Sequence, residues 1–383
     1  VLSNRARLPY AIGLVLAGLA LGNLLPYSGP HLSKELLFLV FLPGLLFEAA
    51  FQIHFPEVWR ARMSILTLAV PGLVVATFLT ALLLWWGVNL LRPGAINFIE
   101  ALVFGALISA TDPISVLAIF RTLGVDKRLA VIVEAESLFN DGTAIVVFTI
   151  VLAMATGAEL SVGGALMEFL RVSGLAIAVG AAVGVIVSLV TRAIDDPMIE
   201  ITLTVLAAYG AFVVAELLGL SGVIACVVAG MVTGNWGAQH GMQPATRVAV
   251  DAFWSYLAFL LNSFVFLLVG LEINLARLMQ YLPEILIGWV AINVARGAHV
   301  YSKYAIMRLA GSDGMPASWA AVLSWGGLRG GLSMVLALSL PRDFGHRDLI
   351  LHVTFGVVLL TLLVQGLTVK PLLRAVGLAG DKA

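Results

Sequence analysis

The sequence predicts an all-α membrane protein that crosses the bilayer many times, and three observations support this fold class. Of its 383 residues, 61% are hydrophobic and only 11% are charged, and the mean hydropathy is +1.03. Apolar runs of about 20 residues, the length that spans a bilayer as a helix, recur along the whole chain. The runs are continuously apolar rather than alternating, as expected for helices and not for an outer-membrane barrel.

Twelve apolar runs between charged or Pro/Gly-rich breaks are predicted to be membrane spans. They are 9–25, 34–53, 63–87, 97–120, 129–156, 164–191, 198–218, 220–236, 250–271, 282–307, 317–340 and 349–375. We expect a very tight turn around Gly219 to join the seventh and eighth spans. The connections are short, so there is no room for a soluble catalytic domain, and function must lie within the membrane.

Composition and charge exclude several classes of protein. The low charge content excludes a soluble enzyme and a disordered protein. Lys plus Arg and Asp plus Glu both number 22, so no net field attracts a nucleic acid, and none is expected as a partner. The single cysteine, Cys226, leaves no intramolecular disulfide to form. We therefore expect a multi-pass protein that is not an enzyme, with the lipid bilayer as its surroundings.

The basic residues of the connections predict the orientation. With the N-terminus placed inside, alternate connections hold 14 Lys and Arg on the inner side and 5 on the outer side. Short loops on the cytoplasmic side of a membrane are enriched in Lys and Arg. The bias supports both the number of spans and a topology with the two termini inside.

Two of the predicted spans are interrupted by residues that break helices. The span 97–120 contains Ser109–Pro113, in which Pro113 donates no backbone hydrogen bond and disfavours helical dihedrals at Asp112. The span 317–340 contains four glycines around Arg329, at 326–331. Glycines also allow close helix packing and a proline also kinks a helix. Interrupted helices at corresponding places in two halves of a chain, however, indicate a transporter's binding site.

The interrupted spans lie seven spans apart, which predicts an inverted-repeat transporter. We expect residues 1–163 to form the first repeat, 164–191 a linking helix and 192–383 the second repeat, all in one transmembrane unit. The first repeat then has five spans and the second six. We therefore expect the natural protein to have one more helix before Val1, giving thirteen spans.

Several charged residues fall inside the predicted spans, where a charge costs several kcal/mol and persists mainly where it functions or is paired. The candidates for such a role are Glu48, Asp112, Glu136, Asp141, Glu216, Arg296 and Arg329. Glu216 lies near a span end and is expected to be structural. The two arginines cannot bind a cation, so we expect them to pair with carboxylates or with the carbonyl groups of unwound backbone.

The stretch 136–143 carries the densest set of polar groups. On a helix Ser137 and Asp141 share one face, whereas Glu136 and Asn140 share another. The helix therefore presents a hydroxyl and a carboxylate together in one direction. A second carboxylate and an amide lie in the other direction.

These oxygen atoms suit a hard monovalent cation. An unwound segment at Thr111 and Asp112 would supply free carbonyl groups as well. Burial favours the protonated form of a carboxylate, whereas a bound cation favours the ionised form. A proton and a cation that compete for one carboxylate are the simplest physical basis for antiport.

Five motifs, in order along the chain, carry a family resemblance. They are Phe47-Glu48-Ala49-Ala50, Thr111-Asp112-Pro113, the stretch 136–142 (ESLFNDG), Asn293-Val294-Ala295-Arg296-Gly297 and Gly326-Gly327-Leu328-Arg329-Gly330. Over essentially its whole length the sequence resembles the monovalent cation:proton antiporters. It is most similar to the NhaP/NHE branch, which has Asn-Asp where another branch has Asp-Asp.

The resemblance implies the NhaA-like antiporter fold and a homodimer of thirteen-helix protomers in a prokaryotic inner membrane. It implies that Na⁺ is held by Asp141, Asp112, Ser137 and the backbone around Thr111, with Glu48 acting through water. The ion-carrying part would be mainly 97–156 and 282–375. Glu136 would pair with Arg296, and Asn140 and Arg329 would support the site. The ligands are transported cations and protons, and no cofactor is expected.

The leading hypothesis is Na⁺ (or Li⁺) exchange for H⁺ by alternating access, electroneutral at one cation per proton. K⁺/H⁺ exchange on the same fold is the alternative, because a sequence does not show ion-sized geometry. Two other classes are a cation channel and an intramembrane aspartyl protease, since Asp112 and Asp141 lie on neighbouring spans. The protease family's Gly-x-Gly-Asp motif is missing, and buried arginines with a proton-accepting carboxylate favour a carrier over a channel.

Overall fold

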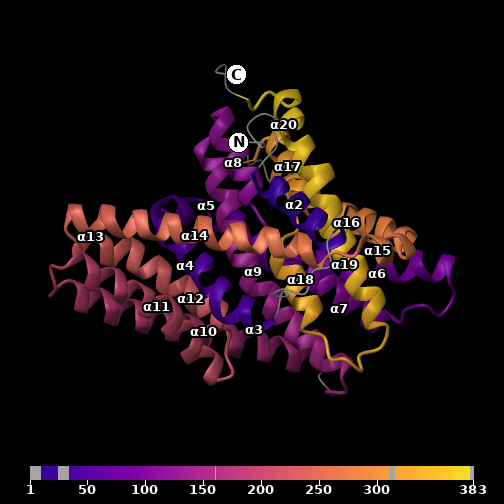
Figure 1. The fold of residues 1–383 in the computed structure, drawn as a ribbon, viewed down its shortest axis with the longest axis horizontal. Helices are drawn as coiled ribbons and strands as arrows, with labels where there is room; N and C mark the ends of the chain where they lie inside the picture. The colour runs from indigo at the N-terminus through magenta and orange to yellow at the C-terminus, as the bar shows by residue number, and fades with distance from the viewer. Residues whose placement is uncertain (1–9, 25–33, 160, 310–314, 380–383) are drawn as a thin grey trace.

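The computed structural model describes residues 10–24, 34–159, 161–309 and 315–379, and every regular element in these ranges is a helix (Figure 1). The helices up to residue 159 are α2 (Tyr10–Leu24), α3 (Lys34–Leu36), α4 (Leu42–Gln52), α5 (Phe55–Thr67), α6 (Leu73–Leu91), α7 (Phe98–Ile108), α8 (Ile114–Leu123) and α9 (Lys127–Ala155). Two π-helical segments, η1 (Leu37–Phe41) and η2 (Leu68–Gly72), continue α3 into α4 and α5 into α6.

The regular elements described after residue 160 are also all helical. These helices are α10 (Val162–Thr191), α11 (Pro197–Leu217), α12 (Gly222–Val232), α13 (Ala238–His240), α14 (Pro244–Glu272), α15 (Leu275–Gln280), α16 (Leu282–Leu309), α17 (Ala317–Trp325), α18 (Gly331–Leu338), α19 (Arg347–Leu360) and α20 (Gly366–Ala375). The π-helical segment η3 (Thr233–Gly237) joins α12 to α13, and η4 (Thr361–Gln365) joins α19 to α20. The predicted all-α class is confirmed.

The helices coincide with the predicted spans, and six continuous helical segments are long and apolar enough to cross a membrane. Among the described residues these are Phe55–Leu91, Lys127–Ala155, Val162–Thr191, Pro197–Leu217, Pro244–Glu272 and Arg347–Ala375. The largest difference is the third predicted span, 63–87, which begins at Phe55 in the structure. Arg60 and Arg62 indicated a connection between two spans. In the structure they lie on α5, which extends the apolar helix toward the N-terminus and has Pro56 in its first turn.

Side-chain caps and left-handed glycines set several helix ends. Asn97 and Glu100 form a reciprocal capping box at the start of α7, with both bonds 2.9 Å long. Gly219 adopts a φ of +67° in the predicted tight turn between α11 and α12. Across this turn Glu216 Oε1 accepts a hydrogen bond of 3.0 Å from the backbone of Gly222. Glu216 therefore has the structural position that was expected of it.

Both predicted interruptions are present, and they meet. The chain leaves the helical path at 109–113, between α7 and α8, and at 326–330, between α17 and α18. The backbone N–H of Asp112 donates a 2.8 Å hydrogen bond to the carbonyl of Leu328. Two unwound segments that are distant in sequence are thus joined directly through their backbones.

The central helix α9 contacts elements on both sides of the molecule. Figure 1 shows α10, α11 and α12 gathered at one end and α6, α15 and α19 at the other, with α9 between them. The helix α9 packs against α5 and α7 and also against α10 and α12. Residues 136–141, in the middle of α9, are therefore placed beside the interrupted helices.

Candidate cation-binding site

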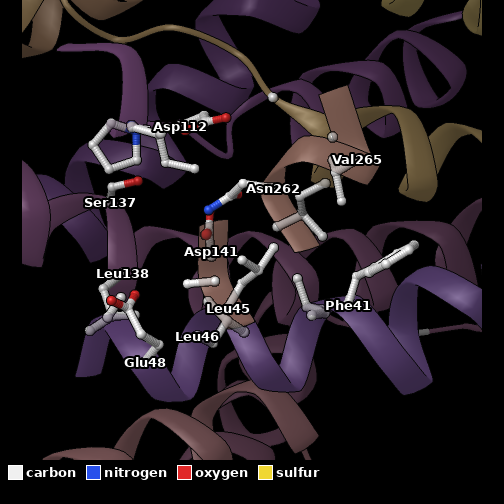
Figure 2. A pocket seen from close by; sticks show the side chains of 18 of the residues that line it. Phe41, Leu45, Leu46, Glu48, Asp112, Ser137, Leu138, Asp141, Asn262 and Val265 are labelled. Carbon is white, nitrogen blue, oxygen red and sulfur yellow. Dashed lines mark hydrogen bonds between the residues drawn. The ribbon is translucent and has the colours of Figure 1, made fainter. Parts of the chain in front are cut away.

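All five predicted cation-binding residues line one cavity of about 400 Å³ (Figure 2). One side of the cavity is formed by α9 and the two interruptions and carries Asp112, Ser137 and Asp141. The opposite side, here called the α4–α14 wall, consists of the cavity-lining residues of α4 and α14 and includes Glu48. The structure therefore brings together residues that were singled out from three separate motifs.

Asp141 is the carboxylate most available to a ligand. Its side chain extends from α9 into the cavity (Figure 2). Among the described residues its carboxylate has no hydrogen-bond partner. Asp112 differs, because its Oδ1 accepts a hydrogen bond of 3.0 Å from the backbone of Ile114, at the start of α8. Asp141 is thus a half-buried carboxylate left open to whatever occupies the cavity.

The residues next to these carboxylates hold the unwound backbone in place. The Ser137 hydroxyl donates a short hydrogen bond to the carbonyl of Thr111. The Asn140 amide donates to the Thr111 hydroxyl at 3.3 Å and to Glu136 Oε1 at 3.2 Å. Asn140 therefore links the unwound segment to the second carboxylate of α9 rather than entering the cavity.

Glu136 and Arg296 form a buried, bidentate ion pair. Both guanidinium contacts to the carboxylate are 3.1 Å long, and the side chains are 2% and 7% exposed. Arg296 Nε also donates to the carbonyl of Leu323, near the end of α17, at 2.9 Å. A second cavity of about 10 Å³, lined in part by this pair and by Asp112, has room for roughly one water molecule.

Arg329 stabilises the crossing of the interrupted helices. Its guanidinium donates to the carbonyls of Ile108, at 2.6 Å, and Ala110, at 3.3 Å, where α7 has ended. These carbonyls have lost their helical partners, and the C-terminal end of a helix dipole attracts a cation. Arg329 therefore satisfies the unwound backbone and does not line the main cavity.

The cavity also contains polar residues that were not selected from the sequence. Glu134 and Arg121 line it beyond Glu48, and Ser255 and Asn262 line it from α14. Glu134 could have been found as a further charge within a span. Asn262 could have been found as an amide inside the apolar run 250–271.

Gly330 leaves room for Asp112, which makes it a sensitive position for substitution. A Cβ at residue 330 would lie 2.6 Å from both Cβ and Oδ2 of Asp112. Overpacking of this kind costs about 1–3 kcal/mol, so we expect Gly330→Ala to displace Asp112 and to lower cation binding at least about fivefold. Gly210→Ala on α11 is the matched control, because its Cβ would meet nothing within 4 Å. Cation-dependent thermal stabilisation in detergent measures binding, and equal responses of the two variants would contradict the prediction.

Comparison with known proteins gives a consistent result. The family described as "Sodium/hydrogen exchanger, transmembrane" matches residues 1–375. The Na⁺/H⁺ antiporter ApNhaP of Aphanothece halophytica is 40% identical over 378 residues, which are 98% of this chain and 71% of that protein. The low-affinity Na⁺/H⁺ antiporter NhaS1 of Synechocystis is 41% identical over 385 residues, again 98% and 71%.

A solved structure has the same fold. The sodium proton antiporter MjNhaP1 from Methanocaldococcus jannaschii, determined at pH 8, superposes with a TM-score of 0.78. The alignment covers 99% of this chain and 95% of that chain at 19% sequence identity. The predicted antiporter architecture is therefore confirmed at the level of the fold.

Proposed function

Because the chain belongs to the sodium/hydrogen exchanger family, as its motifs predict, we propose that the Asp141 cavity is where it exchanges Na⁺ for H⁺ across the membrane. The observation that carries this proposal is the open carboxylate of Asp141 in a cavity that Asp112, Ser137 and Thr111 share. A carboxylate can bind a proton or a cation at the same oxygen atoms. One group can therefore hold either ion but not both.

The cation is proposed to be held by oxygen atoms of Asp141, Asp112, Ser137 and Thr111. The Ser137 hydroxyl uses its proton on the Thr111 carbonyl, which leaves its oxygen lone pairs free for a cation. Glu48 lies on the α4–α14 wall of the same cavity, and we propose that it acts through water. Alternating access would move this set of ligands relative to that wall.

We propose that the exchange is electroneutral, one cation for one proton. Asn140 is an amide that releases no proton, and its side chain is bonded to Thr111 and Glu136. Glu136 stays ionised in its bidentate pair with Arg296. Asp141 is then the one group that exchanges its proton during the cycle.

Voltage independence is the expected result in reconstituted vesicles. A potassium–valinomycin potential imposed on proteoliposomes at fixed Na⁺ and H⁺ gradients should leave the exchange rate unchanged, because no net charge moves. The proton flux is read from a pH-sensitive dye, with protein-free liposomes as the leak control. A rate or an endpoint that follows the membrane potential would show that net charge moves and would contradict the one-to-one exchange.

The same vesicles identify the ion. Na⁺, Li⁺ and K⁺ added in turn should give proton movement with Na⁺ and Li⁺, and a response to K⁺ alone would replace the proposal by K⁺/H⁺ exchange. We further propose that the chain works as a homodimer in a prokaryotic cell membrane, on the strength of its family. The mass of the detergent-solubilised particle tests the dimer.

A further inference from the structure

The α4–α14 wall that faces Asp141 is built mainly from apolar side chains. The cavity-lining residues of α14 recur at the spacing of a helical turn, so one face of α14 borders the cavity. This face consists of Ser255, Ala258, Phe259, Asn262, Val265 and Phe266. From Ala258 to Phe266 the other cavity-lining residues of this face are apolar, and Asn262 is the polar residue among them.

The polar groups of this wall differ in whether they already have a partner. Gln52 Nε2 on α4 donates a 3.0 Å hydrogen bond to Ser255 Oγ, so these two side chains bond each other. Among the described residues the amide of Asn262 has no hydrogen-bond partner. Figure 2 shows this amide pointing toward the carboxylate of Asp141. Two unpartnered polar side chains thus extend into one cavity from opposite sides.

The chemistry of the two groups fits a cation between them. A carboxylate and an amide carbonyl are both hard oxygen ligands of the type that alkali and alkaline-earth ions prefer. An unpartnered amide next to a cavity in an apolar helix costs free energy unless a ligand or water satisfies it. When the cavity holds no cation, the amide can turn and present its N–H groups to the ionised carboxylate instead.

We propose that the amide oxygen of Asn262 is a further ligand for the transported cation, supplied by the α4–α14 wall opposite Asp141. This proposal rests on the exchange function proposed above. The other ligands belong to α9 and the interruptions, which would move together relative to the wall. Asn262 therefore adds to the affinity in the arrangement seen here, and its contact with the cation has to break before the site can open to the other side.

The test replaces Asn262 by Leu, which has nearly the same shape without polar atoms, and by Ala, in case Leu interferes with folding. Loss of one contact to a charged ligand should raise the apparent KM for Na⁺ about tenfold or more. The maximal rate should not fall, because the proton-exchanging carboxylate is intact. Gln280→Leu on α15 is the matched control, because it removes an exposed amide that does not line the cavity, and its KM should be unchanged.

Na⁺-dependent thermal stabilisation in detergent separates this proposal from the exchange function. The Na⁺ concentration that gives half the maximal stabilisation should rise about tenfold in both Asn262 variants. Wild-type exchange combined with an unchanged KM and unchanged stabilisation in the variants would overturn the role of Asn262 alone. Absence of wild-type exchange, with stabilisation that still depends on Asn262, would contradict the exchange function and keep Asn262 as a ligand. A fall in the maximal rate at constant KM would also overturn the proposal.

Discussion

Asp141→Asn is expected to abolish Na⁺-driven proton movement while the protein still folds and inserts. The amide has nearly the shape of the carboxylate but cannot bind and release a proton in the working pH range. Because the carboxylate of Asp141 has no hydrogen-bond partner among the described residues, the substitution breaks no bond within them. Reconstituted variant protein should give the proton flux of protein-free liposomes, measured with a pH-sensitive dye after Na⁺ is added.

The matched control for this result is Glu216→Gln. It is also a carboxylate-to-amide change, and the amide oxygen can still accept the hydrogen bond from Gly222 across the turn after α11. Its exchange rate should equal that of the wild type. If the Asp141 variant still exchanged ions at a rate near that of this control, Asp141 would not be the group that exchanges the proton and the cation.

Arg296→Ala is expected to destabilise the fold by about 3–5 kcal/mol, because it leaves Glu136 charged, buried and without its counterion. The substitution also removes the bond to the Leu323 carbonyl. Unfolding in a graded detergent mixture gives the free energy of unfolding. Transport should fall as a consequence of lost folded protein rather than through a changed KM.

Two further variants distinguish the effect of losing the buried ion pair from a general loss of stability. The double variant Glu136→Leu/Arg296→Met removes both charges, so it should be more stable than Arg296→Ala. Arg171→Ala breaks the exposed pair with Glu168 on α10, which has a contact of 2.7 Å and side chains 49% and 38% exposed. Both side chains lie on the outside of the fold, so the substitution leaves no charge enclosed within it, and a smaller loss of stability than for Arg296→Ala is expected. An Arg296→Ala protein as stable as the Arg171 variant would show that the buried pair is not structural.

The positions of the two interruptions could be predicted from the sequence because they depend on local backbone chemistry. Pro113 and the cluster of glycines around Arg329 weaken a helix through the local backbone, and the structure breaks at 109–113 and 326–330. The shared face of Ser137 and Asp141 follows from helical periodicity in the same way. What the sequence does not contain is the contact between the two breaks, such as the bond from Asp112 to Leu328.

The contribution of α14 to the opposite wall of the cavity was the part that sequence reasoning missed. Charged residues within spans attract notice, but Asn262 is neutral, and its importance depends on which face of α14 turns toward α9. That rotation is decided by tertiary packing, for example by the fit of Gly270 on α14 against the backbone of Val15 on α2. Helical periodicity predicts which residues share a face of a helix, but it does not predict which other helix that face contacts.

The bonds from Arg329 to the interrupted helix have a consequence for the order of events during synthesis. Ala110 and Arg329 are separated by 219 residues, so at about 5–20 residues per second the ribosome delivers the arginine roughly 10–40 s after the carbonyl it satisfies. During that interval α7 and α8 lie in the bilayer with open backbone groups. Unsatisfied backbone groups in the bilayer destabilise this part of the chain, and proteases in cells remove destabilised proteins. We therefore expect chains truncated before α17 to be degraded rapidly in cells, although every helix of their first half is already present.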